Sequence, residues 1–309
     1  MNSLTNIYCI VVTYNGGKWV DYCFGSLRKS GVAVKIICID NGSTDNTVSQ
    51  ISSKFPEVEL IETGINLGFG QANNIGIRKA LAANATYVFL LNQDAWVREN
   101  SIALLLEQAE INHDFGILSP VHLTTDGNNL EQQFKEFTSY PYTGALLADL
   151  YFNRMQPLYE TNYIHAAAWF ISITCIKKTG GFDPLYFHYG EDDDYLQRAK
   201  HFGFKVGIVT GAEIVHDSKY NSWELMEWNK NRNMIIAYKI LKNMKAPFHS
   251  NFLYYFKTSI DEISSLLLFR KFKKCWFRFK IFCSVLKRTR KIRKSYYRSF
   301  QTDFLIENK

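Results

Sequence analysis

The sequence predicts an α/β fold in which a mostly parallel sheet has helices on both faces. Short runs of β-branched residues alternate with helical stretches, at the spacing of strand–helix–strand units. The 309 residues are enough to bury a sizeable core, and 47% of them are hydrophobic. Polar residues also recur wherever an expected strand ends. The composition excludes a disordered or collagen-like chain.

The expected strands are short apolar runs rich in Val, Ile and Leu, as in strands that are buried on both faces of a sheet. These runs cover residues 7–14, 34–40, 58–63, 86–92, 116–120, 165–173 and 205–217. Residues 122–162 are polar and aromatic without a clear period, so we expect a loop region or an insertion there.

The expected helices lie between these runs and are recognised by their ends. Gly31 closes the first helix, and Ser, Thr and Asp at 43–45 offer caps for the second. Pro247 marks a break after the last helix of this part. The helices are expected at 17–31, 43–55, about 70–83, near 99–111, from the acidic stretch to about 202, and at 223–243.

The net charge of +7 is concentrated near the C-terminus. Residues 1–244 carry 20 Lys/Arg and 25 Asp/Glu, whereas residues 245–300 carry 15 and 2. We therefore expect an α/β domain over 1–244 and a basic, amphipathic helical tail over 245–309.

Residues 264–295 interleave Leu, Phe, Trp and Ile with Lys and Arg. This pattern favours a helix that lies on an anionic membrane surface. It also fits a pair of helices that pack on the domain and expose a basic face. No RNA-binding motif is visible, so no nucleic-acid partner is expected.

The six cysteines form no CxxC motif, and Cys9 and Cys38 sit inside apolar runs, as buried small hydrophobes do. No secretory leader is visible before the first strand, so we expect a reducing, cytoplasmic compartment. No apolar run reaches the roughly 18 residues that a membrane-spanning helix needs.

Ligands of open α/β sheets bind outside the carboxyl ends of the strands. Polar residues follow the expected strands at 13–15, 40–43, 92–94 and 216–217. We expect these groups to meet at one edge of the sheet. Asp94 follows a buried strand and needs a partner, and with His216 it forms a candidate site for a divalent ion. Simpler alternatives are a plain turn at 40–42 and a purely structural role for His216.

Six motifs follow one another along the chain: VVTYN at 11–15, IDNGSTDNT at 39–47, NLGFGQANNIGI at 66–77, LLNQDAWV at 90–97, GGFDPLYFHYGEDDDYLQR at 180–198 and IVHD at 214–217. In this order they resemble family 2 glycosyltransferases with the Rossmann-like GT-A fold, in particular the bacterial rhamnosyltransferase-like branch. The similarity runs from about residue 7 to about residue 240. It implies that residues 1–244 are the catalytic domain.

The resemblance implies that a UDP- or dTDP-linked sugar donor binds across the edge of the sheet. The donor-binding residues that it implies are Thr13, Tyr14, Asn15, Asp40, Asn66, Gly68, Asn73, Asn92 and Asp94. The first four of these belong around the base and the ribose. The next three line the nucleotide and sugar pocket.

The family's DXD motif corresponds here to Asn92-Gln93-Asp94, so an amide replaces the first acid. The resemblance implies a divalent cofactor, Mn²⁺ or Mg²⁺, with Asp94 and His216 as its protein ligands. Such an ion neutralises the charge that develops on a leaving nucleoside diphosphate.

The resemblance assigns the catalytic base to Asp192, within a Glu-Asp-x-Asp motif. An acceptor hydroxyl is a weak nucleophile and needs a positioned base, and in-line attack without a covalent intermediate inverts the anomeric centre. The residues expected to contact the acceptor or to shape the site are Glu191, Asp194, Trp169 and Arg232.

We therefore expect an inverting, metal-dependent glycosyltransferase that acts on a glycan or lipid-linked saccharide in surface polysaccharide synthesis. If the tail binds lipid, the enzyme lies at the inner face of the cell membrane. One alternative is an inactive nucleotide-binding or scaffolding homologue, suggested by Asn92. Another is a metal-dependent nucleotidyltransferase, against which the acidic motif after GGFD argues.

Overall fold

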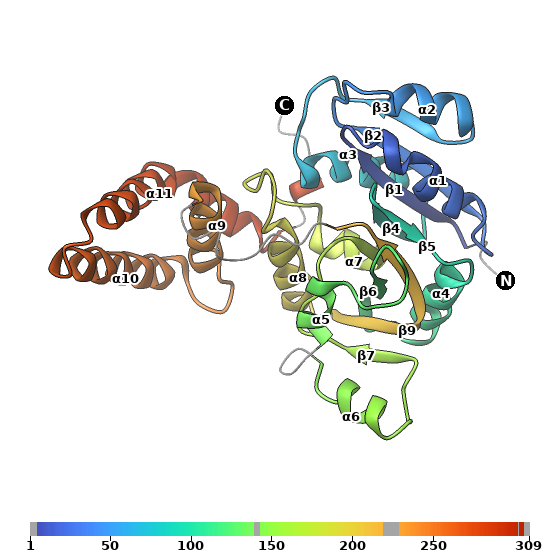
Figure 1. Cartoon of the computed structure of the whole chain (residues 1–309). Coiled ribbons are helices and arrows are strands. Elements are labelled where there is room, and N and C mark those ends of the chain that lie inside the picture. Colours follow the sequence, from blue (N-terminus) through green and yellow to red (C-terminus); the bar gives the residue numbers. More distant parts are fainter. Residues whose placement is uncertain (1–4, 139–142, 219–228, 302, 306–309) are drawn as a thin grey trace.

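The protein is described by a computed structural model over residues 5–138, 143–218, 229–301 and 303–305. Its centre is one mixed sheet with strand order β3-β2-β1-β4-β8-β6-β9-β5, and β7 pairs with β9 beside this path (Figure 1). The strands are β1 (Ile7–Thr13), β2 (Val34–Asp40), β3 (Glu59–Glu62), β4 (Tyr87–Asn92), β5 (Ala95–Val97), β6 (Phe115–Leu123), β7 (Leu158–Glu160), β8 (Ala168–Ser172) and β9 (Lys205–His216).

The helices follow the predicted alternation and continue beyond it. They are α1 (Val20–Arg28), α2 (Thr47–Lys54), α3 (Phe69–Ala82), α4 (Ser101–Ile111), α5 (Gln132–Thr138), α6 (Leu146–Tyr151), α7 (Ile173–Thr179), α8 (Glu191–His201), α9 (Lys230–Leu241), α10 (Phe248–Leu268) and α11 (Phe272–Arg298). Short 3₁₀ turns lie at Gly17–Trp19 and Asp303–Leu305. The part of the predicted helix at 223–243 that precedes residue 229 lies outside the described residues.

The prediction of a parallel sheet describes one half of it. Strands β3, β2, β1 and β4 are all parallel, as are β6 and β9. Strands β8, β5 and β7 pair antiparallel with their neighbours. β5 starts three residues after β4 ends, yet it pairs with β9 and not with β4. The predicted loop region at 122–162 contains α5, α6 and β7.

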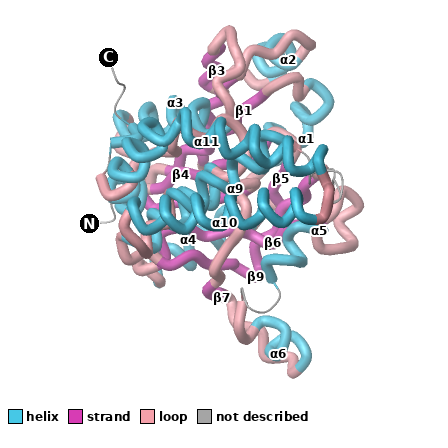
Figure 2. The backbone as a smooth tube through the Cα atoms, turned by 90° about the vertical axis from the view of Figure 1, so that its left-hand side faces the viewer, coloured by secondary structure: helices cyan, strands magenta, loops and turns pink. Residues whose placement is uncertain are grey.

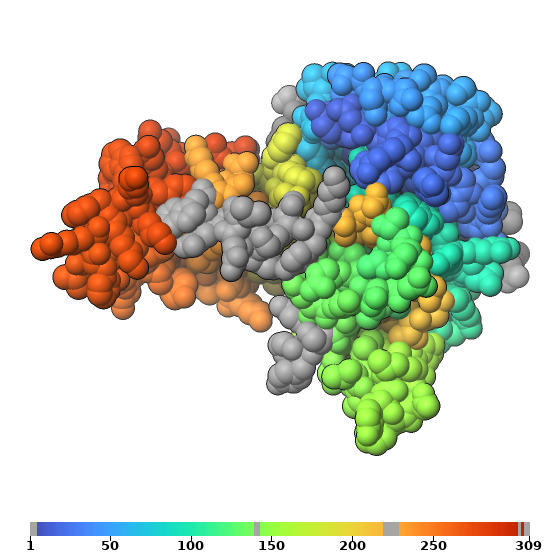
Figure 3. Space-filling view, in the orientation of Figure 1, coloured from blue at the N-terminus to red at the C-terminus, as the bar shows by residue number. Residues whose placement is uncertain are grey.

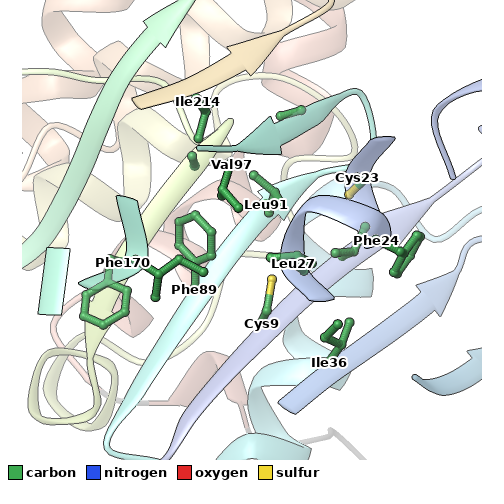
Figure 4. Close-up of a cluster of buried hydrophobic side chains, with 14 of the residues drawn as sticks. Cys9, Cys23, Phe24, Leu27, Ile36, Phe89, Leu91, Val97, Phe170 and Ile214 are labelled. Atoms are coloured by element: carbon green, nitrogen blue, oxygen red, sulfur yellow. The ribbon is translucent and has the colours of Figure 1, made fainter. Parts of the chain in front are cut away.

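Two hydrophobic clusters cover the two faces of the sheet. Ile7, Cys9 and Val11 of β1 enter one cluster, with α1, α2 and α4, while Tyr8 and Ile10 enter the other, with α3, α7 and α8. Figure 4 shows the first cluster, in which Phe89 and Phe170 from neighbouring strands lie side by side. Alternate residues of a strand point to opposite faces, so a strand buried on both sides must be apolar throughout.

Helices α9, α10 and α11 pack around a third hydrophobic cluster, which also includes Tyr186 from the segment before α8. Figure 1 shows α10 and α11 running side by side away from the sheet, and Figure 2 shows the three helices in front of it. The predicted boundary after residue 244 falls between α9 and α10, whose buried residues share this cluster. In packing terms α9 therefore belongs with the tail.

The six cysteines are free thiols, and all except the half-buried Cys283 are buried. The two predicted to be buried, Cys9 and Cys38, are fully enclosed. Among the described residues, no helix has both the length and the apolar character needed to cross a membrane.

Candidate active site

Thr13 and Asp40 end the neighbouring strands β1 and β2, where they are register partners. Both side chains are buried, and Thr13 Oγ1 donates a hydrogen bond to Asp40 Oδ1 at 2.9 Å. The backbone N–H of Ser43 donates to Asp40 Oδ2, also at 2.9 Å. A buried carboxylate is stable when donors satisfy its oxygens in this way. Asp40 is thereby fixed at the carboxyl edge of the sheet.

The loop at Tyr14 and Asn15 joins three strand ends. Asn15 has a φ of 48°, and its Oδ1 accepts a hydrogen bond from the Thr44 N–H at 2.8 Å. Gln93 Oε1 accepts from the Tyr14 N–H at 2.9 Å, so the loop after β4 is tied to the loop after β1. The Tyr14 ring is exposed and available to a ligand.

Asn66 and Gly68 lie in the loop before α3. Asn66 Oδ1 accepts from the Gly68 N–H at 2.9 Å and from Asn41 Nδ2 at 3.0 Å. Gly68 has a φ of 82°, and a Cβ at this position would lie 2.1 Å from the carbonyl oxygen of Phe187. Only glycine allows so close an approach of two loops.

Asn73 differs from the other predicted donor residues because its side chain is used inside α3. It is buried, and its Nδ2 donates to the carbonyl of Phe69 at 3.0 Å. The neighbouring Asn74, which was not predicted, binds both backbone groups of Phe182 at 2.8 Å. Asn74 therefore fastens α3 to the loop that leads to α8.

Asp94 and His216 are brought together by the pairing of β5 with β9, in which Ala95 faces His216. His216 Nε2 lies 3.4 Å from Asp94 Oδ1, with the aspartate side chain 26% exposed and the histidine buried. Asn92 is half-buried at the end of β4. The Nδ1 atom of His216 has no hydrogen-bond partner among the described residues. The Asp94 oxygen and the His216 Nε2 atom that faces it fit the donor set of a divalent transition metal.

Asp192 lies in the first turn of α8, where the N–H groups of the helix carry a partial positive charge. Tyr163 O–H donates to Asp192 Oδ2 at 2.7 Å, and the Asp193 N–H donates to Asp192 Oδ1 at 2.8 Å. These two donors hold the carboxylate in one orientation. Gly190, with a φ of 86°, precedes the helix and sets its start.

The other three acids of α8 have different environments. Burial and the charge of Asp192 raise the pKa of Glu191 to about 8, so Glu191 keeps its proton at neutral pH. The same two causes raise the pKa of Asp193 to about 6, although Asp193 forms an ion pair with Lys239. Burial raises the pKa of Asp194, but Lys242 and Arg198 lower it by more.

Trp169 and Asp194 were predicted to contact the acceptor or to shape the site, and the structure places both side chains in the interior. Trp169 is 0% exposed and packs against Phe182. Asp194 is buried between Lys242 and Arg198. Neither side chain is exposed to an acceptor, because the core and the ion pairs enclose them. Arg232 lies in the first turn of α9, whose N-terminus is capped by the side chain of Asn229.

Four side chains at this edge were not predicted from the sequence: Tyr163, His165, His122 and Glu131. The charges of Asp94 and Asp192 both act on the imidazole of His165. Burial and the neighbouring His216 outweigh them and lower the pKa of His165 to about 4. Burial likewise lowers the pKa of His122 well below its usual value. The sequence around His122 and His165 offers one sign of their burial, because both lie within or beside apolar runs.

Loops from several strand ends thus surround a carboxylate–imidazole pair, and a second, oriented carboxylate stands at the start of α8. This arrangement on a mixed α/β sheet defines a glycosyltransferase of the GT-A fold. The model of glycosyl transferase family 2 matches residues 8–172, and the chain belongs to that family. The predicted fold, family and class of enzyme are confirmed.

Two relatives of known activity are similar over most of the chain. An N-acetylglucosaminyl-diphospho-decaprenol L-rhamnosyltransferase of Mycobacterium tuberculosis is 26% identical over 239 residues, which cover 69% of this chain and 76% of the relative. A dTDP-rhamnosyl transferase of Shigella flexneri is 25% identical over 221 residues, or 70% of each chain.

The fold is shared with a mannosyltransferase from Pyrobaculum calidifontis, whose structure was solved in complex with GDP-Man and Mn²⁺. The two structures align with a TM-score of 0.58 at 14% sequence identity. The alignment covers 100% of this chain and 89% of the other.

Proposed function

We propose that this protein transfers a sugar, with inversion, from a UDP- or dTDP-linked donor to a hydroxyl of a lipid-linked saccharide in surface polysaccharide synthesis. The observation that carries the proposal is that two carboxylates from distant parts of the chain lie on either side of the segment at 163–165. Asp94 lies beside His216, whose ring stacks on His165 with the ring centroids 5.8 Å apart, and Asp192 accepts a hydrogen bond from Tyr163. One carboxylate belongs to the loop after β4 and the other to α8. The names of the two relatives support a dTDP-linked donor and a lipid-linked acceptor.

Asp94 and His216 would hold the divalent ion that neutralises the leaving nucleoside diphosphate. Thr13, Asp40 and the loop around Gly68 bind the nucleotide at the carboxyl edge of the sheet. Hydrogen bonds of the Thr13, Asp40, Asn66 and Gly68 side chains and backbone are formed within the protein itself, so these loops are organised without a ligand.

Asp192 accepts the proton of the acceptor hydroxyl as its oxygen attacks the anomeric carbon. The bond from that carbon to the donor phosphate breaks on the opposite side, which inverts the anomeric centre. Tyr163 orients the carboxylate through its O–H. Glu191, which keeps its proton at neutral pH, places a neutral acid rather than a second anion beside Asp192.

The donor and its metal requirement can be tested by thermal shift with a panel of nucleotide sugars, with and without Mn²⁺. At about 100 times its Kd, the correct donor with Mn²⁺ is expected to raise Tm by about 5 °C. Asp94→Ala is expected to abolish the part of this shift that depends on Mn²⁺. The control Asp21→Ala, at an exposed residue that pairs with Lys54, is expected to keep it. A full Mn²⁺-dependent shift in Asp94→Ala would rule out the assigned metal ligand.

We also propose that the turn between α10 and α11 contacts an anionic membrane. The buried faces of α10 and α11 pack against each other and against α9, so the buried apolar residues of the predicted segment 264–295, such as Ile281 and Val285, serve this core. The tip of the α10–α11 hairpin does not. Leu268, Phe269 and Phe272 are 79%, 68% and 63% exposed, and Figure 3 shows the hairpin projecting away from the α/β domain.

The tip also carries a cluster of cations. The exposed apolar side chains are interleaved with basic residues, namely Arg270, Lys271, Lys273 and Lys274. Aromatic side chains enter the headgroup zone of a bilayer while Lys and Arg bind anionic lipid. Apolar residues at the end of a projecting hairpin, surrounded by cations, therefore fit a lipid surface.

Replacing Phe269 and Phe272 together by Ser is expected to lower the partition of the protein onto vesicles with about one-third phosphatidylserine by at least tenfold, since each buried Phe contributes about 1.5–3 kcal/mol. The matched control is the double replacement of Tyr151 and Phe152 by Ser, because these aromatic residues are also exposed but lie at α6. Sedimentation with vesicles measures both. Equal losses in the two variants, or no loss in the first, would contradict a specific role for the tip.

A further inference from the structure

Four side chains from separate parts of the chain, one of which is His216, lie close together next to Asp94. They are His122 of β6, Glu131 before α5, His165 before β8, and His216 at the end of β9. Each offers one ligand atom, and these four atoms lie within 4.8 Å of one another. The set is buried, with only the His165 side chain reaching 12% exposure.

The spacing of the cluster is close to that of a metal site. His122 Nδ1 and His165 Nε2 are 3.2 Å apart, and His165 Nε2 lies 3.7 Å from Glu131 Oε2. In a tetrahedral site with bonds of about 2.0–2.1 Å, neighbouring ligand atoms are about 3.3 Å apart. Adjustments of a few tenths of an ångström would therefore be enough for these atoms to enclose an ion.

Hydrogen bonds within the protein account for only part of the cluster. His122 Nε2 contacts Ser119 Oγ at 3.1 Å, and Glu131 Oε2 accepts from the Phe134 N–H at 2.9 Å. The Nδ1 atoms of His165 and His216 are both buried without a partner among the described residues. His165 faces His122 and Glu131 with its Nε2 atom, so its Nδ1 atom lies on the other side of the ring. His216 faces Asp94 with its Nε2 atom, and an unpaired buried Nδ1 atom on the other side of that ring is costly and indicates a missing ligand.

We propose that His122, Glu131, His165 and His216 bind a zinc-class transition metal ion, and that they do so without nucleotide. Three imidazoles and one carboxylate favour Zn²⁺, Co²⁺ or Mn²⁺ over Mg²⁺, which prefers oxygen ligands. Ser119 and the N-terminus of α5 orient two of the ligands from outside, as outer partners do in metal sites. This site is distinct from the site of the donor-dependent ion expected at Asp94, although His216 belongs to both sites.

Such an ion would stabilise the edge of the sheet at the position where the family motif has lost an acid. His216 contacts Asp94 on one side and belongs to the cluster on the other. An ion in the cluster fixes the His216 ring and so fixes the position of the donor-side carboxylate. The amide at Asn92 removes a negative charge from the donor site, and the cluster provides a separate cation nearby.

The test is metal binding by the full chain, stripped with chelator and kept free of nucleotide. Calorimetric titration with Zn²⁺ is expected to show one ion per chain, and Co²⁺ is expected to give the visible absorption of a four-coordinate site. His165→Gln and Glu131→Gln are each expected to weaken Zn²⁺ binding at least tenfold. His113→Gln, the same change at an exposed histidine, is expected to leave it unchanged.

Asp94→Ala separates this inference from the proposed function. It is expected to retain nucleotide-free Zn²⁺ binding while losing the Mn²⁺-dependent donor shift. Absence of stoichiometric Zn²⁺ or Co²⁺ binding by the wild-type chain would overturn the proposal without any variant. Wild-type affinity in His165→Gln, with circular dichroism showing a folded protein, would overturn it as well.

Discussion

Asp192→Asn is expected to lower kcat by about 10²–10⁴-fold while leaving donor affinity unchanged. The amide cannot accept the proton of the acceptor hydroxyl, but it preserves the size of the side chain and can still accept a hydrogen bond from Tyr163. Donor binding depends on the strand-end loops and on Asp94, which the change does not touch. Steady-state kinetics and calorimetric titration of the donor measure the two quantities separately.

The matched control is Asp193→Asn, which makes the same chemical change one residue further along α8. Asp193 pairs with Lys239 rather than with Tyr163, so turnover is expected to stay near the wild-type rate. Normal turnover in Asp192→Asn would show that another group accepts the proton. Equal losses of kcat in both variants would indicate that catalysis depends on the total charge at the start of α8 and not on one base.

Lys242→Met is expected to destabilise the protein by about 3–5 kcal/mol, since it strands buried charges. Lys242 is 1% exposed, and its Nζ pairs with the carboxylates of Asp183 and Asp194. Arg198 Nε lies 2.9 Å from Asp194 Oδ2 and still compensates that carboxylate in part. Ser295 donates a hydrogen bond to Asp183 but carries no charge. Urea unfolding followed by tryptophan fluorescence gives the free energy.

Lys239→Met serves as the control because Lys239, in α9 just before Lys242, also pairs with an acid of α8. Its side chain is 45% exposed, so its ion pair with Asp193 contributes only about 0–1 kcal/mol. A loss below about 1 kcal/mol in Lys242→Met would mean that water reaches this network in solution.

Much of the first half of the fold could be predicted because its signals are local. The apolar runs of β1, β2 and β4 and the helices between them lie close to their predicted positions. The direction of β8 and β5 could not be predicted, because the residues of a strand do not indicate which neighbour it pairs with. The separate core of α9, α10 and α11 depends on contacts between segments far apart in sequence.

The candidate site shows the same limit. Asp94 and His216 could be paired in advance because each follows a strand end, and strand ends share an edge. Asp192 and Asp194 lie about 200° apart around a helix, so they face different surroundings. The motif alone does not tell which of the two side chains contacts a buried lysine. His122 and His165 enter the site only through the pairing of β6 and β8 with their neighbours.

The buried network around Lys242 also ties the hairpin to α8, the helix that carries Asp192. Lys242 follows α9 and Ser295 belongs to α11, and both bind acids in or just before the helix that carries Asp192. A hairpin held on a bilayer through its tip would then keep the reacting carboxylate at a constant height above the lipid. Acceptors whose terminal sugar reaches that height would be glycosylated, and shorter or longer ones would not. The hairpin would thereby make the enzyme selective for acceptors of one glycan length.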